Sequence, residues 1–360
     1  MKKKRKKQIN CGGVPIGGDA PISIQSMTKT KTSDPKATLA QIDRLAEAGC
    51  DIARLAVPDM DAALAFEKIK AKSPLPLVAD IHFDHRLAIA AIESGADKIR
   101  INPGNIGSED KVLEVVEAAK RAGIPIRVGV NSGSLQKDIL ERDGGVSPAG
   151  LAESAMRNVS LLESMGFEDI VISLKSSNVR LNTEAYRLVH EQSDHPLHIG
   201  VTEAGTLARG KVKSAAGIGA LLLDGIGDTM RVSLTADPVE EITFAKELLT
   251  ALDMRSEGIE IISCPTCGRT RVDLEKIVAG VEEKLGPIRD EYATSGRKLK
   301  LAVMGCAVNG PGEARGADVG VACGEGKGVL FAGGEIVGSV EEAEIPDAII
   351  GIIKEYERLT

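Results

Sequence analysis

The feature that most constrains the fold is a phrase that the chain repeats: a helix end, a glycine, and then a short apolar strand. The phrase occurs at 45–57, 91–102, 120–131 and 162–175. Glycine just past a helix end takes the left-handed conformation that closes the helix, so each phrase marks a helix that leads into a strand. Strands that alternate with helices in this way indicate parallel β-α-β units.

The pattern marks eight strands, at 22–27, 52–57, 77–82, 98–102, 126–131, 169–175, 197–203 and 229–234. A helix follows each strand, the last near 237–251. Eight parallel β/α units in ~250 residues are typical of a TIM (β/α)8 barrel. A doubly wound open sheet is disfavoured because no G-x-G-x-x-G turn follows a strand. We therefore expect an α/β protein with a barrel domain at 1–254 and a smaller α/β domain at 255–360.

Composition supports this fold class and limits the partners. Aromatic residues are 2% of the chain, Trp is absent and glycine is abundant, which favours an aliphatic α/β core over an all-β one. The net charge is −7 although 2–7 is entirely basic, so the remainder is more acidic still and a general nucleic-acid surface is excluded. We expect the basic run to be a solvated, disordered terminus.

The expected location in the cell follows from the targeting and membrane segments that the sequence lacks. No stretch of 18 or more apolar residues is present, and no apolar segment follows the basic run as in a secretory signal. Six cysteines without framework spacing fit a reducing compartment. We expect a cytoplasmic protein without a membrane partner, in which Cys11, Cys50 and Cys323 are small buried hydrophobes.

Polar residues lie along the barrel strands and at their carboxyl ends, where TIM barrels place their active sites. In strand order they are Arg54; Asp80 and His82; Arg100 and Asn102; Arg127 and Asn131; Ser173 and Lys175; His198, Thr202 and Glu203; Arg231 and Ser233. An unpaired charge inside a barrel is costly, and Asp80 and Glu203 could neutralise only one or two of the cations. The excess predicts a polyanionic ligand, because arginine forks match phosphate oxygens.

The glycine-rich loops at 102–107 and 202–205 add backbone N–H donors to this predicted anion site. A nucleotide is disfavoured because the chain has no P-loop. The barrel therefore predicts a small phosphorylated substrate.

Three cysteines of the second domain indicate a metal site. Cys264 and Cys267 form a C-x2-C pair, and Cys306 stands among glycines, each after an expected strand, at 259–263 and 299–304. Closed zinc sites and iron–sulfur clusters normally take four protein ligands. The fourth could be Glu313, Cys323 or a substrate. A zinc ribbon usually has two C-x2-C knuckles, so the single pair favours iron–sulfur. Further strands are expected at 319–323 and 328–331, and helices near 272–284 and at 341–358.

Several stretches carry a resemblance to a known family. They are 12–21, 78–83, 100–107, 202–205, 225–229, 264–267 and 305–313. Together they are highly specific, and the chain resembles the 4-hydroxy-3-methylbut-2-enyl diphosphate synthase family of the non-mevalonate isoprenoid pathway in its shorter two-domain form. The resemblance implies a TIM barrel followed by a [4Fe-4S] domain similar to those of sulfite and nitrite reductases.

The resemblance also implies a reaction. The family opens 2-C-methyl-D-erythritol 2,4-cyclodiphosphate reductively, with two electrons from reduced flavodoxin or ferredoxin. It implies that Cys264, Cys267, Cys306 and Glu313 hold the cluster, with Glu313 as a displaceable ligand. We hypothesise two further sets of roles. The diphosphate would be bound by Arg54, Arg100, Arg127, Lys175 and His198. Its hydroxyls would be contacted, or protons supplied, by Asp80, Asn131 and Glu203.

The chain path predicts a head-to-tail homodimer. In a β/α barrel each helix returns from the catalytic rim to the opposite face, and the helix at 237–251 spans roughly 20 Å. The second domain therefore starts on the face away from its own barrel's site, and we expect its cluster to serve a partner chain. Two rival functions stay open: a zinc-stabilised phosphosugar aldolase or isomerase with Lys175 as Schiff base, and a non-enzymatic redox or phosphometabolite sensor.

Overall fold

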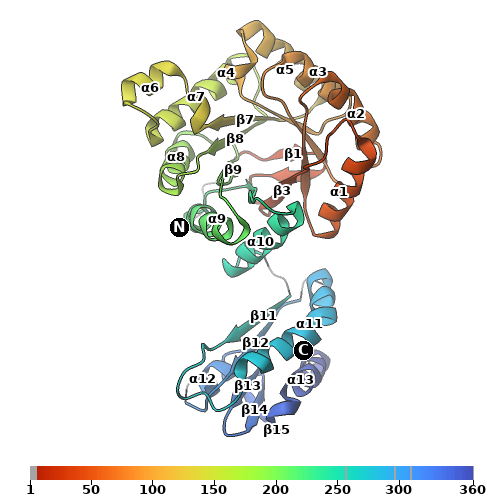
Figure 1. The fold of residues 1–360 in the computed structure, drawn as a ribbon, viewed down its shortest axis with the longest axis vertical. Helices are drawn as coiled ribbons and strands as arrows, with labels where there is room; N and C mark the ends of the chain where they lie inside the picture. The colour runs from red at the N-terminus through yellow and green to blue at the C-terminus, as the bar shows by residue number, and fades with distance from the viewer. Residues whose placement is uncertain (1–5, 256–257, 296, 309, 360) are drawn as a thin grey trace. The chain divides into compact units, whose positions relative to one another are not determined.

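The computed structural model describes residues 6–255, 258–295, 297–308 and 310–359. Figure 1 shows the chain as two compact units that divide between Leu252 and Asp253. The division falls two residues before the boundary expected from the sequence. The residues 1–5 of the basic run lie outside the described part of the chain.

The first unit is a closed parallel barrel, as predicted. Its eight strands pair in the order β8-β7-β6-β5-β4-β3-β10-β9, and a bridge between Ile172 and Leu197 joins the two ends. The strands are β3 (Ser23–Met27), β4 (Ile52–Ala56), β5 (Leu77–Asp80), β6 (Lys98–Ile101), β7 (Ile126–Asn131), β8 (Ile170–Lys175), β9 (His198–Ile199) and β10 (Thr229–Met230). Strands β9 and β10 are shorter than predicted, because the chain leaves the ladder at Gly200 and Arg231.

A ring of helices surrounds the barrel (Figure 1). They are α1 (Pro35–Glu47), α2 (Met60–Lys70), α3 (His85–Glu93), α5 (Glu109–Ala122), α7 (Pro148–Ser164), α8 (Val179–Gln192), α9 (Leu207–Leu223) and α10 (Pro238–Ala251). Short helices precede two of them: α4 (Pro103–Ile106), and α6 (Lys137–Asp143) with the 3-10 turn η1 (Ser132–Ser134). The repeated glycine closes α5 as expected, since Gly123 has a left-handed φ of 65°.

The seam between β8 and β9 is closed by side chains of α8 rather than by a regular ladder. The Tyr186 hydroxyl accepts a hydrogen bond from Leu174 N (3.0 Å) and donates one to the carbonyl of His198. Asn182 donates to the carbonyl of Gly200 (3.1 Å). These buried bonds satisfy backbone groups that a two-residue strand leaves unpaired. Helix α8 thereby fixes the strands that carry Lys175 and His198.

A hairpin that the sequence did not predict closes the amino end of the barrel. Strands β1 (Ile9–Cys11) and β2 (Val14–Ile16) pair antiparallel. Their apolar side chains pack against Ile52, Val78 and Val171, which stand at the starts of barrel strands. The carboxyl ends of the strands therefore form the open end of the barrel.

The described end of the basic run is ordered, contrary to the prediction of a solvated terminus. Lys6 is buried, and its ammonium donates to the carbonyls of His190 (2.9 Å) and Ser193 at the end of α8. Lys7 pairs with Glu168 at 2.9 Å. Backbone carbonyls at a helix C-terminus attract cations, which explains why a lysine is tolerated there.

The second unit is a five-stranded sheet with helices on both faces. Its strands are β11 (Ile259–Ser263), β12 (Leu299–Met304), β13 (Val319–Cys323), β14 (Lys327–Ala332) and β15 (Glu335–Glu341). The first three are parallel, and the last two join antiparallel. Alternate residues of β12 serve two cores: Leu301 and Val303 pack with α11 (Leu274–Ser295) and α13 (Ile345–Leu359), and Ala302 and Met304 with α12 (Gly310–Arg315).

Two helices of this unit differ in their bounds from the prediction. The closing helix begins at Ile345 rather than 341, because 335–341 forms the edge strand β15 and Glu342–Glu344 a 3-10 turn, η2. Most of β15 is exposed, so it lacks the alternation of a half-buried strand. Helix α11 continues to Ser295, past Pro287. Among the described residues, no helix combines the length and apolar character that crossing a membrane requires.

Replacing Tyr186 with Phe should destabilise the barrel by about 1–3 kcal/mol, because the buried Leu174 N–H and His198 carbonyl lose their partner. Urea unfolding followed by circular dichroism measures the change. Tyr356→Phe is the matched control: its hydroxyl bonds to Asp318 over 3.4 Å in a partly exposed position, so a change within about 0.5 kcal/mol is expected. Equal stability of Tyr186→Phe and the native chain would contradict the role given to α8.

Candidate functional site

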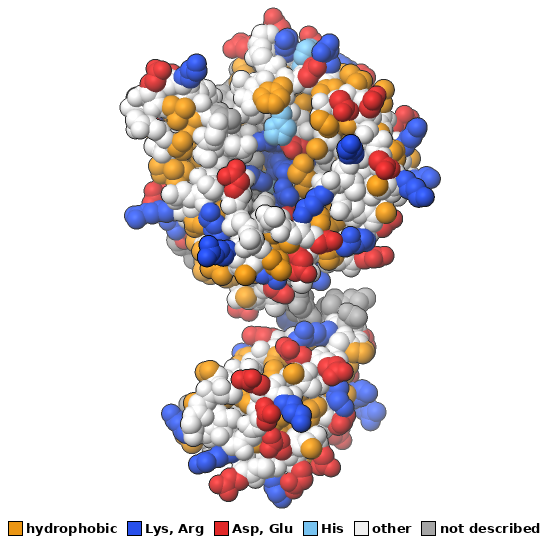
Figure 2. Space-filling view, viewed as in Figure 1, with side chains coloured by type: hydrophobic (Ala, Val, Ile, Leu, Met, Phe, Trp, Pro, Cys, Tyr) orange, Lys and Arg blue, Asp and Glu red, His pale blue; other side chains and the backbone are white. Residues whose placement is uncertain are grey.

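The open end of the barrel is a cationic hollow. Figure 2 shows a depression in the middle of the barrel unit with Lys and Arg side chains at its floor. Arg54, Arg100 and Arg127 come from strands β4, β6 and β7, and all three are buried. Strands β6 and β7 are neighbours, and β5 lies between β4 and β6. In the β6–β7 register Arg100 stands directly opposite Arg127. The arginines predicted from the sequence therefore converge inside the barrel.

One carboxylate, Asp80 on β5, stands between two of these arginines. Its oxygens lie 3.3 Å from Arg100 Nη1 and 3.9 Å from Arg54 Nε, and His82 Nε2 lies 3.4 Å away. Burial alone would raise the pKa of Asp80, but Arg54, a hydrogen bond from His82 and Arg100 hold it far below its usual range. Asp80 is thus ionised at neutral pH and acts as a fixed counter-charge.

Gly129 on β7 makes room for Arg100. A Cβ at this position would collide with the Arg100 Nε atom, whereas the glycine carbonyl accepts a hydrogen bond from Arg100 Nη2 at 3.3 Å. The φ of Gly129 is not left-handed, so space rather than backbone freedom selects glycine here. The strand thereby lets the guanidinium lie flat against its backbone.

The remaining cations outnumber the carboxylates near them. Arg127 is 1% exposed, and its Nε and Nη1 atoms have no hydrogen-bond partner within the described chain. Both ring nitrogens of the fully buried His198 are likewise without one. Burial, and then neighbouring cations, lowers the pKa of Lys175, His198 and Arg127 well below their ordinary values. Buried polar groups of this kind are normally satisfied by water or a ligand, so the hollow is suited to an anion.

The other predicted residues lie on the strands or in the loops around this hollow. Asn131 ends β7, Ser173 lies inside β8, and Asn102 precedes α4. His82, Thr202 and Ser233 follow β5, β9 and β10 respectively. Glu203 is exposed and has a φ of 51°, in the left-handed region that non-glycine residues rarely adopt. Such strained positions are often functional.

Sequence reasoning missed a buried carboxylate that pairs with one of the predicted arginines. Glu241 on α10 is 1% exposed and lies 3.3 Å from Arg231 Nε. The sequence names Glu203 for this role, but the ion pair with Arg231 is made by Glu241. A signal was present: Glu241 stands at helical spacing with Ala245, Leu248 and Leu249, on the apolar stripe that faces the barrel.

The second candidate site is a cavity of about 410 Å³ at the carboxyl ends of β11 and β12. Cys264, Cys267, Cys306 and Glu313 all line it, with Ile262, Pro265 and Met304 as apolar wall and Arg269 at its edge. Cys306 is buried, Cys264 is partly buried and Cys267 is exposed. The four residues predicted as ligands thus share one pocket.

The donor set fits an iron–sulfur cluster better than one zinc ion. The backbone N–H of Gly305 donates to Cys264 Sγ at 3.3 Å, a bond that favours the thiolate. A side chain at Gly305 would press on Thr270 and Leu274, and one at Gly310 on Met304. Within the described ranges, no three potential ligands converge closely enough for a single metal ion. Zinc needs four ligands on one ion, whereas cluster cysteines bind separate irons and can lie farther apart.

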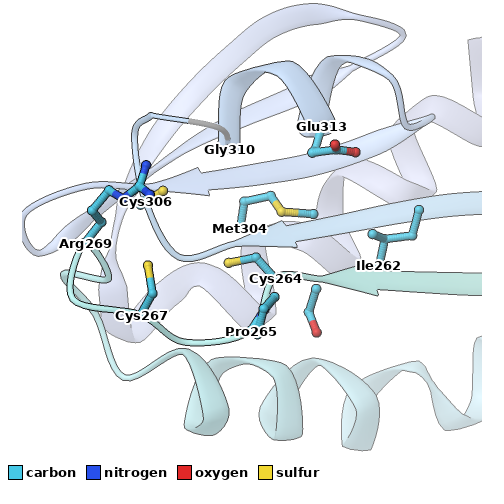
Figure 3. A pocket seen from close by; sticks show the side chains of 10 residues that line it. Ile262, Cys264, Pro265, Cys267, Arg269, Met304, Cys306, Gly310 and Glu313 are labelled. Atoms are coloured by element: carbon cyan, nitrogen blue, oxygen red, sulfur yellow. The ribbon is translucent and has the colours of Figure 1, made fainter.

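Figure 3 shows how the four residues are placed. The three cysteine side chains gather at one end of the pocket, and Glu313 lies apart from them on α12. Glu313 is also exposed. Its side chain would have to turn toward the cysteines to complete the ligand set. Cys323, the other candidate ligand in the chain, does not line this cavity. It is fully buried in the core beneath α11 and α13, and burial raises the pKa of its thiol to about 12.

Both units match models of one protein family. Residues 6–246 match the GcpE TIM-barrel domain, and residues 260–355 match the GcpE protein C-terminal domain. The chain is 54% identical over 357 residues to a protein of Caldanaerobacter subterraneus subsp. tengcongensis, covering 99% of this chain and 98% of the relative. It is 55% identical over 354 residues to a protein of Clostridium perfringens, covering 98% and 99%. Both are named 4-hydroxy-3-methylbut-2-en-1-yl diphosphate synthase (flavodoxin).

Solved structures resemble the barrel in fold alone. Dihydropteroate synthase from Stenotrophomonas maltophilia has a TM-score of 0.51 at 16% identity, covering 68% of this chain and 97% of that one. The enzyme from Xanthomonas albilineans has a TM-score of 0.50 at 17% identity, covering 69% and 98%.

Binding of inorganic sulfate, which carries no titratable proton near neutral pH, to the hollow should take up protons. Lys175 loses its proton more easily than an ordinary lysine because of burial and the nearby Arg54 and Arg127. A bound anion reverses that effect and raises the pKa, so affinity falls as pH rises through this lowered pKa. Calorimetry in buffers of different ionisation enthalpy measures the uptake, and Lys175→Met should reduce it. Proton release on binding would contradict this view of the site.

Proposed function

The chain belongs to the GcpE family, and we propose that it converts 2-C-methyl-D-erythritol 2,4-cyclodiphosphate into 4-hydroxy-3-methylbut-2-enyl diphosphate. The single observation that carries the proposal is the set of buried cations inside the barrel, which exceeds the carboxylates beside them. A small cyclic diphosphate supplies the missing negative charge. The near full-length identity to synthases of this name supports the same reaction.

The reaction balances with two electrons and a proton. The bond between C2 and its phosphate oxygen breaks, the C3 hydroxyl leaves as water, and a C2–C3 double bond forms. The cyclic diester becomes a diphosphate monoester, whose terminal phosphate gains a further ionisable oxygen. The ligand thus becomes more negative as the ring opens. Cations placed where that charge develops favour the step, since fixed charges act strongly in a buried site.

In this proposal the barrel residues bind and orient the diphosphate. Arg54, Arg100, Arg127, Lys175 and His198 surround it, with His82, Arg231 and the rim side chains Asn102, Ser173, Thr202 and Ser233 as further contacts. Asp80 keeps Arg54 and Arg100 in place and, because it is ionised, accepts hydrogen bonds from substrate hydroxyls rather than donating a proton. Asn131 contacts the same hydroxyls.

Glu203 is the proposed proton donor for the departing hydroxyl. It stands at the mouth of the barrel in a left-handed backbone conformation, followed by Gly205 with a φ of 108°. The carbonyl of Gly205 accepts a hydrogen bond from Thr235 N (3.1 Å), which ties this loop to the segment after β10.

Cys264, Cys267, Cys306 and Glu313 would hold a [4Fe-4S] cluster in the second unit. When bound, the cluster supplies the two electrons that the ring opening consumes. The relatives' names indicate reduced flavodoxin as donor, and ferredoxin is the alternative. The zinc-dependent aldolase or isomerase has less support, because the chain has one C-x2-C pair where a zinc ribbon usually has two.

Anaerobically reconstituted protein should absorb visible light and, with dithionite, convert the cyclodiphosphate into the monoester diphosphate. Mass spectrometry detects the product. Cys306→Ser should lose both properties, because it removes a cluster ligand. Cys323→Ala should keep the absorbance, because Cys323 is fully buried and does not line the cavity that the other three cysteines share. Substrate binding without turnover by the cluster-loaded protein would favour the sensor instead.

The protein also acts as a head-to-tail homodimer in this proposal. Helix α10 runs back from the open end of the barrel and ends at Ala251, so the first unit ends at the hairpin-closed face. We propose that the cluster unit of one chain serves the barrel of another.

Mixing two inactive variants tests the dimer. Arg127→Ala removes a barrel cation and Cys306→Ser a cluster ligand. A mixed dimer still has one intact barrel facing one intact cluster, so about a quarter of native activity is expected after random exchange of subunits. If mixtures whose exchange is verified by mass spectrometry stay inactive, each chain uses its own cluster.

A further inference from the structure

The helix that closes the barrel contributes a carboxylate which no substrate atom need touch. Glu241 of α10 is 1% exposed and accepts three kinds of donor. Ser26 Oγ lies 2.9 Å from Oε2, Leu234 N lies 3.0 Å from Oε1, and the Arg231 guanidinium contacts both oxygens at 3.3–3.4 Å. A buried carboxylate with this many partners is held rigidly.

These three donors come from different parts of the barrel. Ser26 lies on β3, and Arg231 and Leu234 lie on the segment that follows β10. Strand β10 has only two residues, so the ladder ends before it reaches Arg231, apart from one bond from Arg231 N to the carbonyl of Ile199 (3.0 Å). Glu241 therefore anchors a segment that the sheet itself leaves loose.

The contacts leave part of the guanidinium available. Distances of 3.3–3.4 Å are longer than those of strong charge-assisted hydrogen bonds. Arg231 Nη1 points instead to the sulfur of Met27, at 3.7 Å. The same sulfur lies 2.9 Å from Arg54 Nη2. A thioether is a weak acceptor that an anion can replace, so Nη1 of Arg231 and Nη2 of Arg54 are turned toward one place.

We propose that Glu241 is a positioning residue, which aims Arg231 beside Arg54 so that both bind the same phosphoryl group. The inference rests on the proposed function. Its physical basis is repulsion: Arg231 lies near Arg54 and Lys175, and each cation disfavours the charge of the others. Without a carboxylate behind it, the Arg231 guanidinium would turn away from them.

The test is Glu241→Gln in the cluster-loaded enzyme. Glutamine keeps the volume and one acceptor oxygen, but it removes the charge and sets an NH2 group against the guanidinium. We expect KM for the cyclodiphosphate to rise ~10-fold or more with kcat within about twofold, as for a lost charge-assisted contact in binding. The inhibition constant of inorganic pyrophosphate should rise by a similar factor.

Glu240→Gln is the matched control, because Glu240 is the preceding residue on α10 and pairs with Lys211 at 3.7 Å near the surface. It should leave KM within about twofold. In an Arg231→Lys background, Glu241→Gln should raise KM by less than about a further twofold, because the guanidinium that Glu241 positions is already absent. Thermal melting of every variant shows whether it is folded.

The outcomes separate the two proposals. A native enzyme that does not turn over the cyclodiphosphate overturns the proposed function. A native enzyme that turns it over, together with a folded Glu241→Gln variant of unchanged KM, overturns the positioning role alone. Full additivity with Arg231→Lys also overturns it, because Glu241 would then act through something other than Arg231.

Discussion

An excess of buried positive charge inside the barrel is the constraint on which the rest of the structure depends. Arg54, Arg100, Arg127 and Lys175 occupy positions that ordinary TIM barrels fill with aliphatic side chains. Such charges destabilise a fold unless they are paired, and Asp80 pairs directly with only Arg54 and Arg100. The barrel around them is held together by the hairpin, which packs on one end, and by side chains of α8, which bridge the β8–β9 seam. The barrel thus presents a preformed cluster of positive charge that suits an anion.

The fold was predictable because its main signal is local. A glycine after several of the helices, with an apolar run after it, marks strands that alternate with helices without any long-range information. The features that the sequence did not predict depend on contacts between residues far apart in the sequence. The role of the hairpin at 9–16 becomes clear only from its contacts with Ile52, Val78 and Val171. The role of the Tyr186 hydroxyl becomes clear only from the short strand β9, whose His198 carbonyl it binds. Strand β15 lies at an exposed edge and shows no alternation.

The two candidate sites differ in how much of each could be predicted from the sequence. In the barrel, strand ends specify where side chains point, so the cations could be named and their convergence expected. Of their counter-charges, Asp80 could also be named because it lies on a strand. Glu241 could not, because it reaches in from a helix, where a carboxylate usually faces solvent. In the second unit the C-x2-C pair indicates a metal, yet nothing in the spacing selects Glu313. Only the family resemblance did so, and the structure places Glu313 in the same pocket but apart from the cysteines.

The charge balance also bears on release of the product. Ring opening makes the ligand more negative, so a site that carried only cations would bind the product more tightly than the substrate and turn over slowly. Asp80 lowers the net charge of the hollow, and Lys175 can lose its proton more easily than an ordinary lysine. We infer that Asp80 therefore has two effects. It holds Arg54 and Arg100 in place for the cyclic diphosphate, and it keeps the attraction for the open diphosphate low enough for the product to leave.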